Sequence, residues 1–306
     1  MTSATVAALK ADRSDQAVAS EATTGRGRRG SGMLIVRMVV LLLCLLWLVP
    51  TVGLLISSFR DKEAVSDSGW WTVIASPLDF SQWTLQNYSD VITGEGMGEA
   101  FVNSIVVAVP ATVIPIMIAA FAAYAFTFMR FRGRDTVFIL VVALLVVPLQ
   151  IAFVPLLQLF RNFDLVGTFP AVWLAHAGFG MPLAIYILRN YMASLPKSII
   201  ESAEVDGASH FQTFWRLIVP MSVPALAAFA IFQFLWVWND LLVALIFLQN
   251  DTPVVTSKLK LLIGDLGQEW HLLTAGAFIS MTIPLIVFFS LQRYFVRGLT
   301  AGSVKG

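Results

Sequence analysis

The stretch FVNSIVVAVPATVIPIMIAAFAAYAFTFM, from Phe101 to Met129, runs for 29 residues without a charged side chain. A helix needs about 20 largely apolar residues to cross the hydrocarbon core of a bilayer. The stretch is apolar throughout and lacks the period-two alternation of a barrel strand. It therefore predicts a helix that crosses a membrane.

Five further stretches share this character, so the sequence predicts an all-α integral membrane protein with six transmembrane helices. The composition agrees, because 58% of the residues are hydrophobic and only 13% are charged, against about 25% charged residues in soluble domains. Mean hydropathy is correspondingly high, at +0.79. The six spans are expected at about residues 38–59, 101–129, 136–160, 165–188, 217–248 and 272–292.

Charge and ligand residues exclude several classes of protein. The 20 basic and 19 acidic residues leave a formal net charge of +1, which argues against nucleic acid as a partner. The three histidines and the single cysteine are too far apart in the sequence for a metal site. The sequence contains neither a phosphate-binding loop nor a recognisable catalytic motif. We therefore expect no metal site, no cofactor and no enzymatic activity in this chain.

The basic residues predict the orientation of the spans, because Lys and Arg are retained on the cytoplasmic side. With both termini in the cytoplasm, 15 of the 20 basic residues fall on that side. Residues 1–33 are expected to form a disordered cytoplasmic leader, since they are rich in Ala, Ser, Thr and Gly and lack periodicity. The transmembrane domain is then residues 34–306.

A cytoplasmic loop at residues 195–220 carries the strongest functional signal. Its sequence, LPKSIIESAEVDGASHFQTFWRLIVP, predicts two short helices joined by a tight turn. Pro196 suits the first turn of a helix, Gly207 a left-handed helix end, and Ser209 the cap of the second helix. Pro220 is expected to mark the exit into the next span.

The two predicted helices have different exposed and buried faces. On the second, the apolar residues fall at i, i+3, i+4 and i+7 and predict a stripe that packs under the bundle; they are Phe211, Phe214, Trp215 and Ile218. The first presents the carboxylates Glu201, Glu204 and Asp206 to the cytosol. A rigid helix pair of this kind is a docking element, and the alternative is a merely structured loop.

This loop resembles the EAA loop of ABC-importer permeases, which reads Glu-Ala-Ala, three residues, Gly, nine residues, Ile, one residue, Leu-Pro. The matching residues are Glu201, Ser202, Ala203, Gly207, Leu217, Val219 and Pro220. In that family the loop sits in a cleft of the ATPase subunit, where the first glutamate, here Glu201, pairs with a basic residue. The resemblance thus implies ATPase-coupling roles for Glu201, Ala203, Asp206, Gly207, Phe211 and Pro220.

The chain after the leader is similar to the shorter permease of maltose-type carbohydrate-uptake systems. The similarity rests on residues 204–208, on Trp238-Asn239-Asp240 and on the C-terminal tail, residues 298–306. Segments 68–72, 189–193 and 292–297 look closest to the α-glucoside branch. In the family the tail reaches the ATPase interface, which implies that role for Gly302, Ser303, Val304, Lys305 and Gly306.

The resemblance implies a transport function and a set of partners. The chain would be the permease subunit of an ATP-driven importer in a bacterial cytoplasmic (inner) membrane. It would move an α-glucoside or another di- or oligosaccharide such as maltose, trehalose or sucrose. Its partners would be a second, distinct permease, two ATP-binding subunits that hold ATP and Mg, an extracytoplasmic sugar-binding protein and membrane lipid.

Two other functions compete with this interpretation. A stand-alone secondary sugar transporter or channel would need coupling charges within the spans, where the only carboxylate is Asp240. A membrane scaffold without transport activity would leave the helix pair and the tail unexplained.

Polar residues within the spans are candidates for the substrate pathway. Trp238, Asn239, Asp240 and Gln150 could line a cavity, since carboxylate and amide groups bond sugar hydroxyls and an indole stacks on a sugar ring. For Asp240 a second interpretation stays open, in which the carboxylate pairs with a neighbouring helix.

Overall fold

The computed structural model describes residues 33–77, 79–249, 252–263 and 269–301, and residues 294–301 are described by their backbone alone. These ranges contain helices and no strand. The chain separates into two units, Met1–Ile56 and Ser57–Gly306. The predicted leader lies outside the described residues, apart from Met33. The described part of the first unit belongs to a helix that runs Met33–Ser58, ends two residues beyond that unit, and exposes almost all of its apolar side chains. Such a surface suits lipid rather than water.

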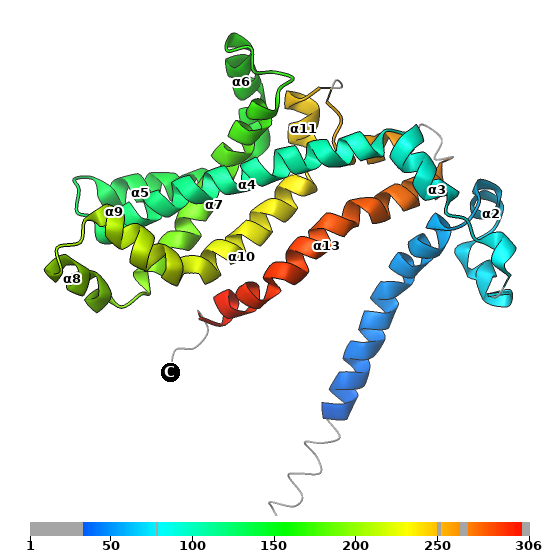
Figure 1. The fold of residues 1–306 in the computed structure, drawn as a ribbon, viewed down its shortest axis with the longest axis horizontal. Coiled ribbons are helices and arrows are strands. Elements are labelled where there is room, and N and C mark those ends of the chain that lie inside the picture. The colour runs from blue at the N-terminus through cyan, green and yellow to red at the C-terminus, as the bar shows by residue number, and fades with distance from the viewer. Residues whose placement is uncertain (1–32, 78, 250–251, 264–268, 302–306) are drawn as a thin grey trace, which may run out of the picture. The chain divides into compact units, whose positions relative to one another are not determined.

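The second unit consists of short helices at one end and long helices that pack together (Figure 1). The short elements before the first long helix are α2 (Lys62–Asp67), η1 (Trp70–Ala75), η2 (Phe80–Gln82), α3 (Gln86–Ser89) and η3 (Asp90–Gly94). Next come α4 (Met97–Phe128), α5 (Arg134–Ala143), η4 (Leu144–Val146), α6 (Leu149–Asn162) and α7 (Phe169–Ala193). The remaining elements are α8 (Lys197–Val205), α9 (His210–Thr213), η5 (Phe214–Ile218), α10 (Val219–Trp238), α11 (Leu242–Phe247), α12 (Val255–Ile263) and α13 (Trp270–Ala301).

Five described helices are long and apolar enough to cross a membrane: Met33–Ser58, Met97–Phe128, Phe169–Ala193, His210–Trp238 and Trp270–Arg293. A sixth span exists only if the bent pair Arg134–Val146 and Leu149–Asn162 is counted as one. The predicted span at 136–160 therefore consists of two helices, which meet at 103°.

Pro148 explains this bend. The residue before a proline is disfavoured in the helical region, and Val147 accordingly has extended backbone angles, φ −75° and ψ 122°. The helical hydrogen bonds stop there, and Pro148 becomes the residue from which α6 starts in a new direction.

The predicted span 217–248 is also two helices. The helix ends at Trp238, and α11 begins after a short break. Asp240 stabilises the restart, because its Oδ2 accepts a 2.8 Å hydrogen bond from the backbone N–H of Val243. A carboxylate at this position satisfies a donor that the first turn of a helix leaves free.

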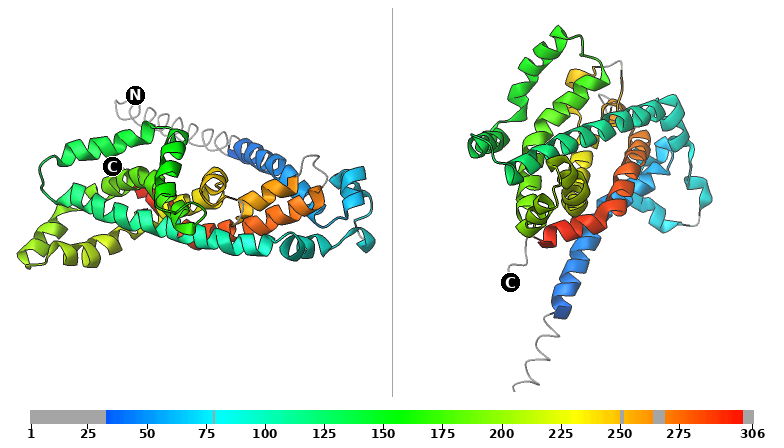
Figure 2. Two further views of the ribbon diagram at one scale, coloured as in Figure 1. Left: turned by 90° about the horizontal axis from the view of Figure 1, so that it is seen from above. Right: turned by 60° about the vertical axis from the view of Figure 1, so that its left-hand side comes forward.

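The core forms where α4 packs on α7 and α10, and where α10 packs on α13 (Figures 1 and 2). Both helices of the α4–α7 pair carry buried small residues in pairs four apart: Ala119 and Ala123 on α4, and Ala171 with Ala175 and Gly180 with Ala184 on α7. Small side chains let two helix backbones approach closely, which is a common basis of helix association in membranes.

Candidate functional site

Local hydrogen bonds build the helix pair of residues 197–213, which we call the hairpin. Gly207 has φ +74°, a left-handed conformation that favours glycine. The Ala208 N–H donates to the Ala203 carbonyl at 2.9 Å and the Gly207 N–H donates to the Glu204 carbonyl at 3.1 Å. This pair of bonds is a Schellman motif and ends α8. The prediction of a left-handed turn at Gly207 is confirmed.

A capping box starts the second helix of the hairpin. The Ser209 hydroxyl accepts from the Gln212 N–H, and the Gln212 side chain accepts from the Ser209 N–H. These reciprocal bonds satisfy two donors that the helix start leaves free. The predicted capping role of Ser209 is therefore also confirmed, and both ends of the turn are defined by residues of the turn itself.

Three contacts fix the hairpin to the bundle. Ile200 and Ala203 are buried on the inner face of α8. The ring of Phe214 stacks on Phe121 of α4 with centroids 4.5 Å apart. His210 Nδ1 lies 3.0 Å from the Tyr124 hydroxyl, also on α4. The hairpin is therefore held in a defined position against the end of α4.

The predicted apolar stripe is only partly correct. Phe214 and Ile218 are buried, whereas the side chains of Phe211 and Trp215 are 66% and 37% exposed. A π-turn occupies Phe214–Ile218, in which the Val219 N–H donates to the carbonyl of Phe214. A wider turn changes the face on which the residues after it lie, whereas Phe211 precedes the turn.

The same π-turn changes the expected role of Pro220. The helix does not end at this residue but continues from His210 to Trp238. A proline inside a helix cannot donate to the carbonyl four residues earlier and its ring crowds that carbonyl. Because the wide turn directly precedes Pro220, the helix passes it without a break.

The outer face of the hairpin is suited to binding another protein. Glu201, Glu204 and Asp206 are exposed, as predicted. Beside them the side chains of Val205 and Phe211 are 87% and 66% exposed. Exposed apolar groups among charges are typical of interaction sites. Sequence reasoning missed Val205, although its place between two carboxylates at the end of an amphipathic helix was the available signal.

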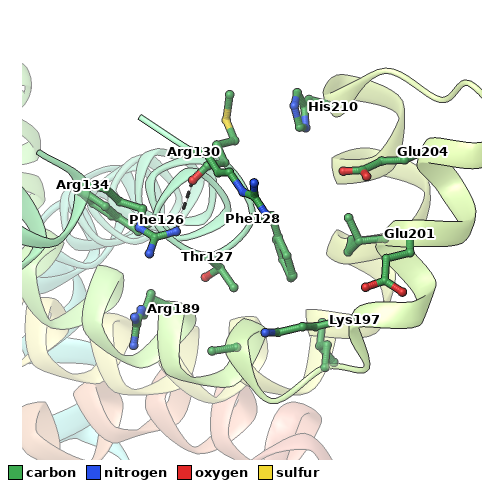
Figure 3. A pocket seen from close by; sticks show the side chains of 14 residues that line it. Phe126, Thr127, Phe128, Arg130, Arg134, Arg189, Lys197, Glu201, Glu204 and His210 are labelled. Carbon is green, nitrogen blue, oxygen red and sulfur yellow. Dashed lines mark hydrogen bonds between the residues drawn. The ribbon is translucent and has the colours of Figure 1, made fainter. Parts of the chain in front are cut away.

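A cavity of about 850 Å³ lies between the hairpin and the bundle (Figure 3). Its cationic side chains are Arg130, Arg134, Arg189 and Lys197, and its acidic ones are Glu201 and Glu204. Among the described residues, neither carboxylate forms a salt bridge. Sequence analysis did not connect these cations with the hairpin, because Arg130 and Arg189 are brought together only by the packing of α4 on α7.

Two of the cations have contacts that hold them in the cavity wall. Arg134 Nε lies 3.0 Å from Asp135 Oδ1. The Arg189 guanidinium lies over the Phe138 ring, 4.7 Å from its centroid, in a cation–π arrangement. Arg134 and Arg189 are therefore held at α5, while the carboxylates stand on α8, which also carries Lys197 (Figure 3).

The residues predicted for the substrate pathway have separate contacts, and two of them, Trp238 and Asp240, line one small cavity. Trp238 is buried, and its Nε1 donates to the Ser280 carbonyl of α13 at 3.0 Å. Asn239 is exposed and donates to its own helix, at the Leu235 carbonyl. Gln150 is exposed in the first turn of α6.

Asp240 contacts a neighbouring helix besides capping α11. Its Oδ2 lies 3.9 Å from His176 Nε2 of α7. Asp240, Trp238 and His176 line a cavity of about 10 Å³, the space of about one water molecule. These contacts favour the structural interpretation of Asp240 over direct binding of a sugar. The tail residues Gly302 to Gly306 lie outside the described residues.

Comparisons with known proteins agree with the resemblance found in the sequence. Residues 102–301 match the family model described as "Binding-protein-dependent transport system inner membrane component". The chain is 58% identical to the osmoprotective compounds uptake permease protein GgtD of Synechocystis, over 88% of this chain and 91% of that protein. It is 44% identical to the alpha-glucoside transport system permease protein AglG of Rhizobium meliloti, over 89% and 97%.

A solved structure shows the same fold. It is a crystal structure of a bacterial ABC transporter involved in the import of the acidic polysaccharide alginate. The likeness has a TM-score of 0.66 at 22% identity and covers 85% of this chain and 95% of that one.

Proposed function

We propose that this chain, which belongs to the family of binding-protein-dependent transport system inner membrane components, is the sugar-translocating permease subunit of an ATP-driven importer. The predicted resemblance to carbohydrate-uptake permeases is confirmed by the family match and by the 44% identical alpha-glucoside permease. The substrate is an α-glucoside or another di- or oligosaccharide such as maltose, trehalose or sucrose.

In the proposed assembly, this chain crosses a bacterial inner membrane six times, with the bent pair α5–α6 counted as one span. Both termini and the hairpin are cytoplasmic. The chain pairs with a second, distinct permease and rests on one of two ATP-binding subunits, which bind ATP and Mg and hydrolyse the nucleotide. An extracytoplasmic sugar-binding protein delivers the substrate.

The observation that carries the proposal is the outer face of the hairpin. Exposed carboxylates and exposed apolar side chains stand on a turn fixed by its own hydrogen bonds. A partner that binds this face can move the transmembrane region, because the second helix of the hairpin is continuous with the span that ends at Trp238. Closure of two ATPases would thus be transmitted to the spans as movement between two states.

The roles of the hairpin residues follow from their positions. Glu201 supplies the charge that meets a basic residue of the ATPase, and Asp206 extends that acidic surface. Ala203 and Gly207 form the end of α8 and keep Glu201 in place. Phe211 is an apolar contact for the partner, and Pro220 marks the join between the hairpin and the span. The tail, Gly302 to Gly306, is proposed as a second ATPase contact.

The test is replacement of Glu201 by alanine, with the complex purified from membranes. We expect Glu201→Ala to insert normally but to lose most sugar uptake and most sugar-stimulated ATP hydrolysis. Ser202→Ala, which restores the alanine of the family pattern, is the matched control and should keep both activities. Normal sugar-stimulated ATP hydrolysis in Glu201→Ala would refute the coupling role.

Co-purification tests the proposed class of transporter. We expect an ATPase and a second permease to accompany this chain from membranes. An active preparation that contains neither would favour a stand-alone secondary transporter or channel.

A further inference from the structure

A third cavity, of about 230 Å³, lies where the bent span α5–α6 breaks. Its walls come from the break and from the facing sides of α7 and α10. The polar and aromatic lining residues are Phe179, Phe232, Gln233 and Trp236, next to Gly180. Apolar and aromatic walls with one polar group are typical of ligand pockets.

The elements around this cavity place it near the centre of the membrane. Gly180 has 11 residues of α7 before it and 13 after it. Ala111, which bonds to Gln233, has 14 residues of α4 before it and 17 after it. In secondary transporters, interrupted helices at this depth are typical of substrate sites.

Gln233 is held in one orientation by a carbonyl that a proline leaves free. Pro115 has no N–H, so it cannot donate to Ala111 four residues earlier. Gln233 Nε2 donates to that carbonyl at 3.2 Å and lies 3.5 Å from the His176 carbonyl. Both partners are carbonyl acceptors, so the amide nitrogen of Gln233 faces them and Oε1 points away from them.

The Oε1 atom of Gln233 is buried and has no hydrogen-bond partner among the described residues. It lies against Gly180, where an added Cβ would be 2.5 Å from it. Glycine at this position therefore makes room for the amide. A buried acceptor without a donor costs free energy, so its retention points to a donor that arrives in another state of the transport cycle.

We propose that this cavity binds one ring of the transported sugar. Gln233 Oε1 accepts a hydrogen bond from a ring hydroxyl, and the aromatic side chains contact the apolar faces of the ring. The volume suits a single ring, because pockets for drug-sized ligands measure about 300–1,000 Å³. The ring enters when the break opens, since Oε1 is covered in this structure. The inference rests on the proposed function and adds a subsite to it.

The first test removes the amide without leaving the Ala111 carbonyl unpaired. Pro115→Ala supplies the missing backbone N–H, so Gln233→Leu in that background loses mainly the free acceptor. The complete complex is reconstituted in liposomes with saturating sugar-loaded binding protein. We expect sugar uptake per ATP hydrolysed to fall about three- to tenfold relative to Pro115→Ala alone, the effect of one neutral hydrogen bond.

Gln158→Leu is the matched control, because Gln158 is an exposed glutamine of α6 outside the cavity. It should leave uptake per ATP unchanged. The subsite would be overturned if Pro115→Ala had the same sugar uptake per ATP hydrolysed with and without Gln233→Leu. It would also be overturned if Gln158→Leu lowered this uptake as much as Gln233→Leu does. Absence of sugar uptake by the wild-type complex would instead overturn the proposed function.

A second test does not depend on the amide variants folding. The only cysteine, Cys44, is exposed on the helix Met33–Ser58 and is replaced by serine. Phe232→Cys then places a single thiol in the cavity wall, since Phe232 is 50% exposed. We expect the transported sugar to slow labelling by a water-soluble thiosulfonate several-fold during turnover. An unchanged labelling rate would contradict occupation of the cavity.

Discussion

The turn at Gly207 gives a quantitative prediction for the hairpin, because the free-energy cost of substituting this glycine comes from one source. An added Cβ at Gly207 meets no atom within 4 Å. Gly207→Ala therefore creates no clash and only forces an L-residue to adopt φ +74°. That conformation costs about 1–2 kcal/mol, which is about a 5- to 30-fold change in a local opening equilibrium.

Hydrogen exchange measures this equilibrium directly. The Ala208 N–H, which donates to Ala203 at 2.9 Å, reports on opening of the cap. We expect its exchange in Gly207→Ala to be about 5- to 30-fold faster than in the wild type. Gly207→Asn should fall between the two, because asparagine tolerates the left-handed region. Binding-protein-stimulated ATP hydrolysis should weaken in the same order.

The relative exchange rates of the Gly207 variants show what limits the stability of the cap. Unchanged exchange at Ala208 in Gly207→Ala would show that the left-handed turn does not limit the stability of the cap. Equal exchange in the asparagine and alanine variants would show that side-chain size, and not backbone conformation, controls it.

Two further predictions concern packing and capping. Phe214→Ala should destabilise the chain by about 3–5 kcal/mol, because Phe214 is only 2% exposed. Phe211→Ala should instead keep the melting temperature of the wild type and lose ATPase binding. Similar melting temperatures for the two variants would contradict this assignment. Asp240→Ala should lower the free energy of unfolding by about 0.5–2 kcal/mol through loss of the cap of α11, while uptake of sugar per ATP persists. Asp240→Asn should recover most of this stability. Loss of uptake in a fully stable Asp240→Asn variant would instead favour a role in the substrate pathway.

Local sequence signals predicted much of the fold. Long uncharged stretches predicted the spans, and Gly207 and Ser209 predicted the turn, because a left-handed residue and a capping hydroxyl act on bonds within a few residues. The size of the bend at Pro148 could not be predicted, although the restriction on Val147 is local, because prolines also occur within continuous spans such as α4. Whether a proline breaks a helix depends on the neighbouring helices that satisfy the freed carbonyls.

The candidate sites were predictable only where one short segment builds them. The acidic face of the hairpin came from consecutive residues and was found. Its cationic counterpart was not, because Arg130 and Arg189 are distant in the sequence and meet through helix packing. Gln233 could not be distinguished from the other polar residues within the spans, since its significance depends on Pro115 in another helix. The exposure of Phe211 was missed because a periodic pattern shows which residues share a face but not how far the neighbouring helices cover that face.

The continuous helix from His210 to Trp238 has a mechanical consequence. Its 29 residues make a rod about 43 Å long, at a rise of about 1.5 Å per residue. A tilt of about 10° around one end of such a rod displaces the other end by about 7 Å. A small rotation imposed on the cytoplasmic end is therefore amplified along this lever arm. Gln233 stands near the far end, so a partner that never touches the sugar can still open and close the place where the sugar would bind.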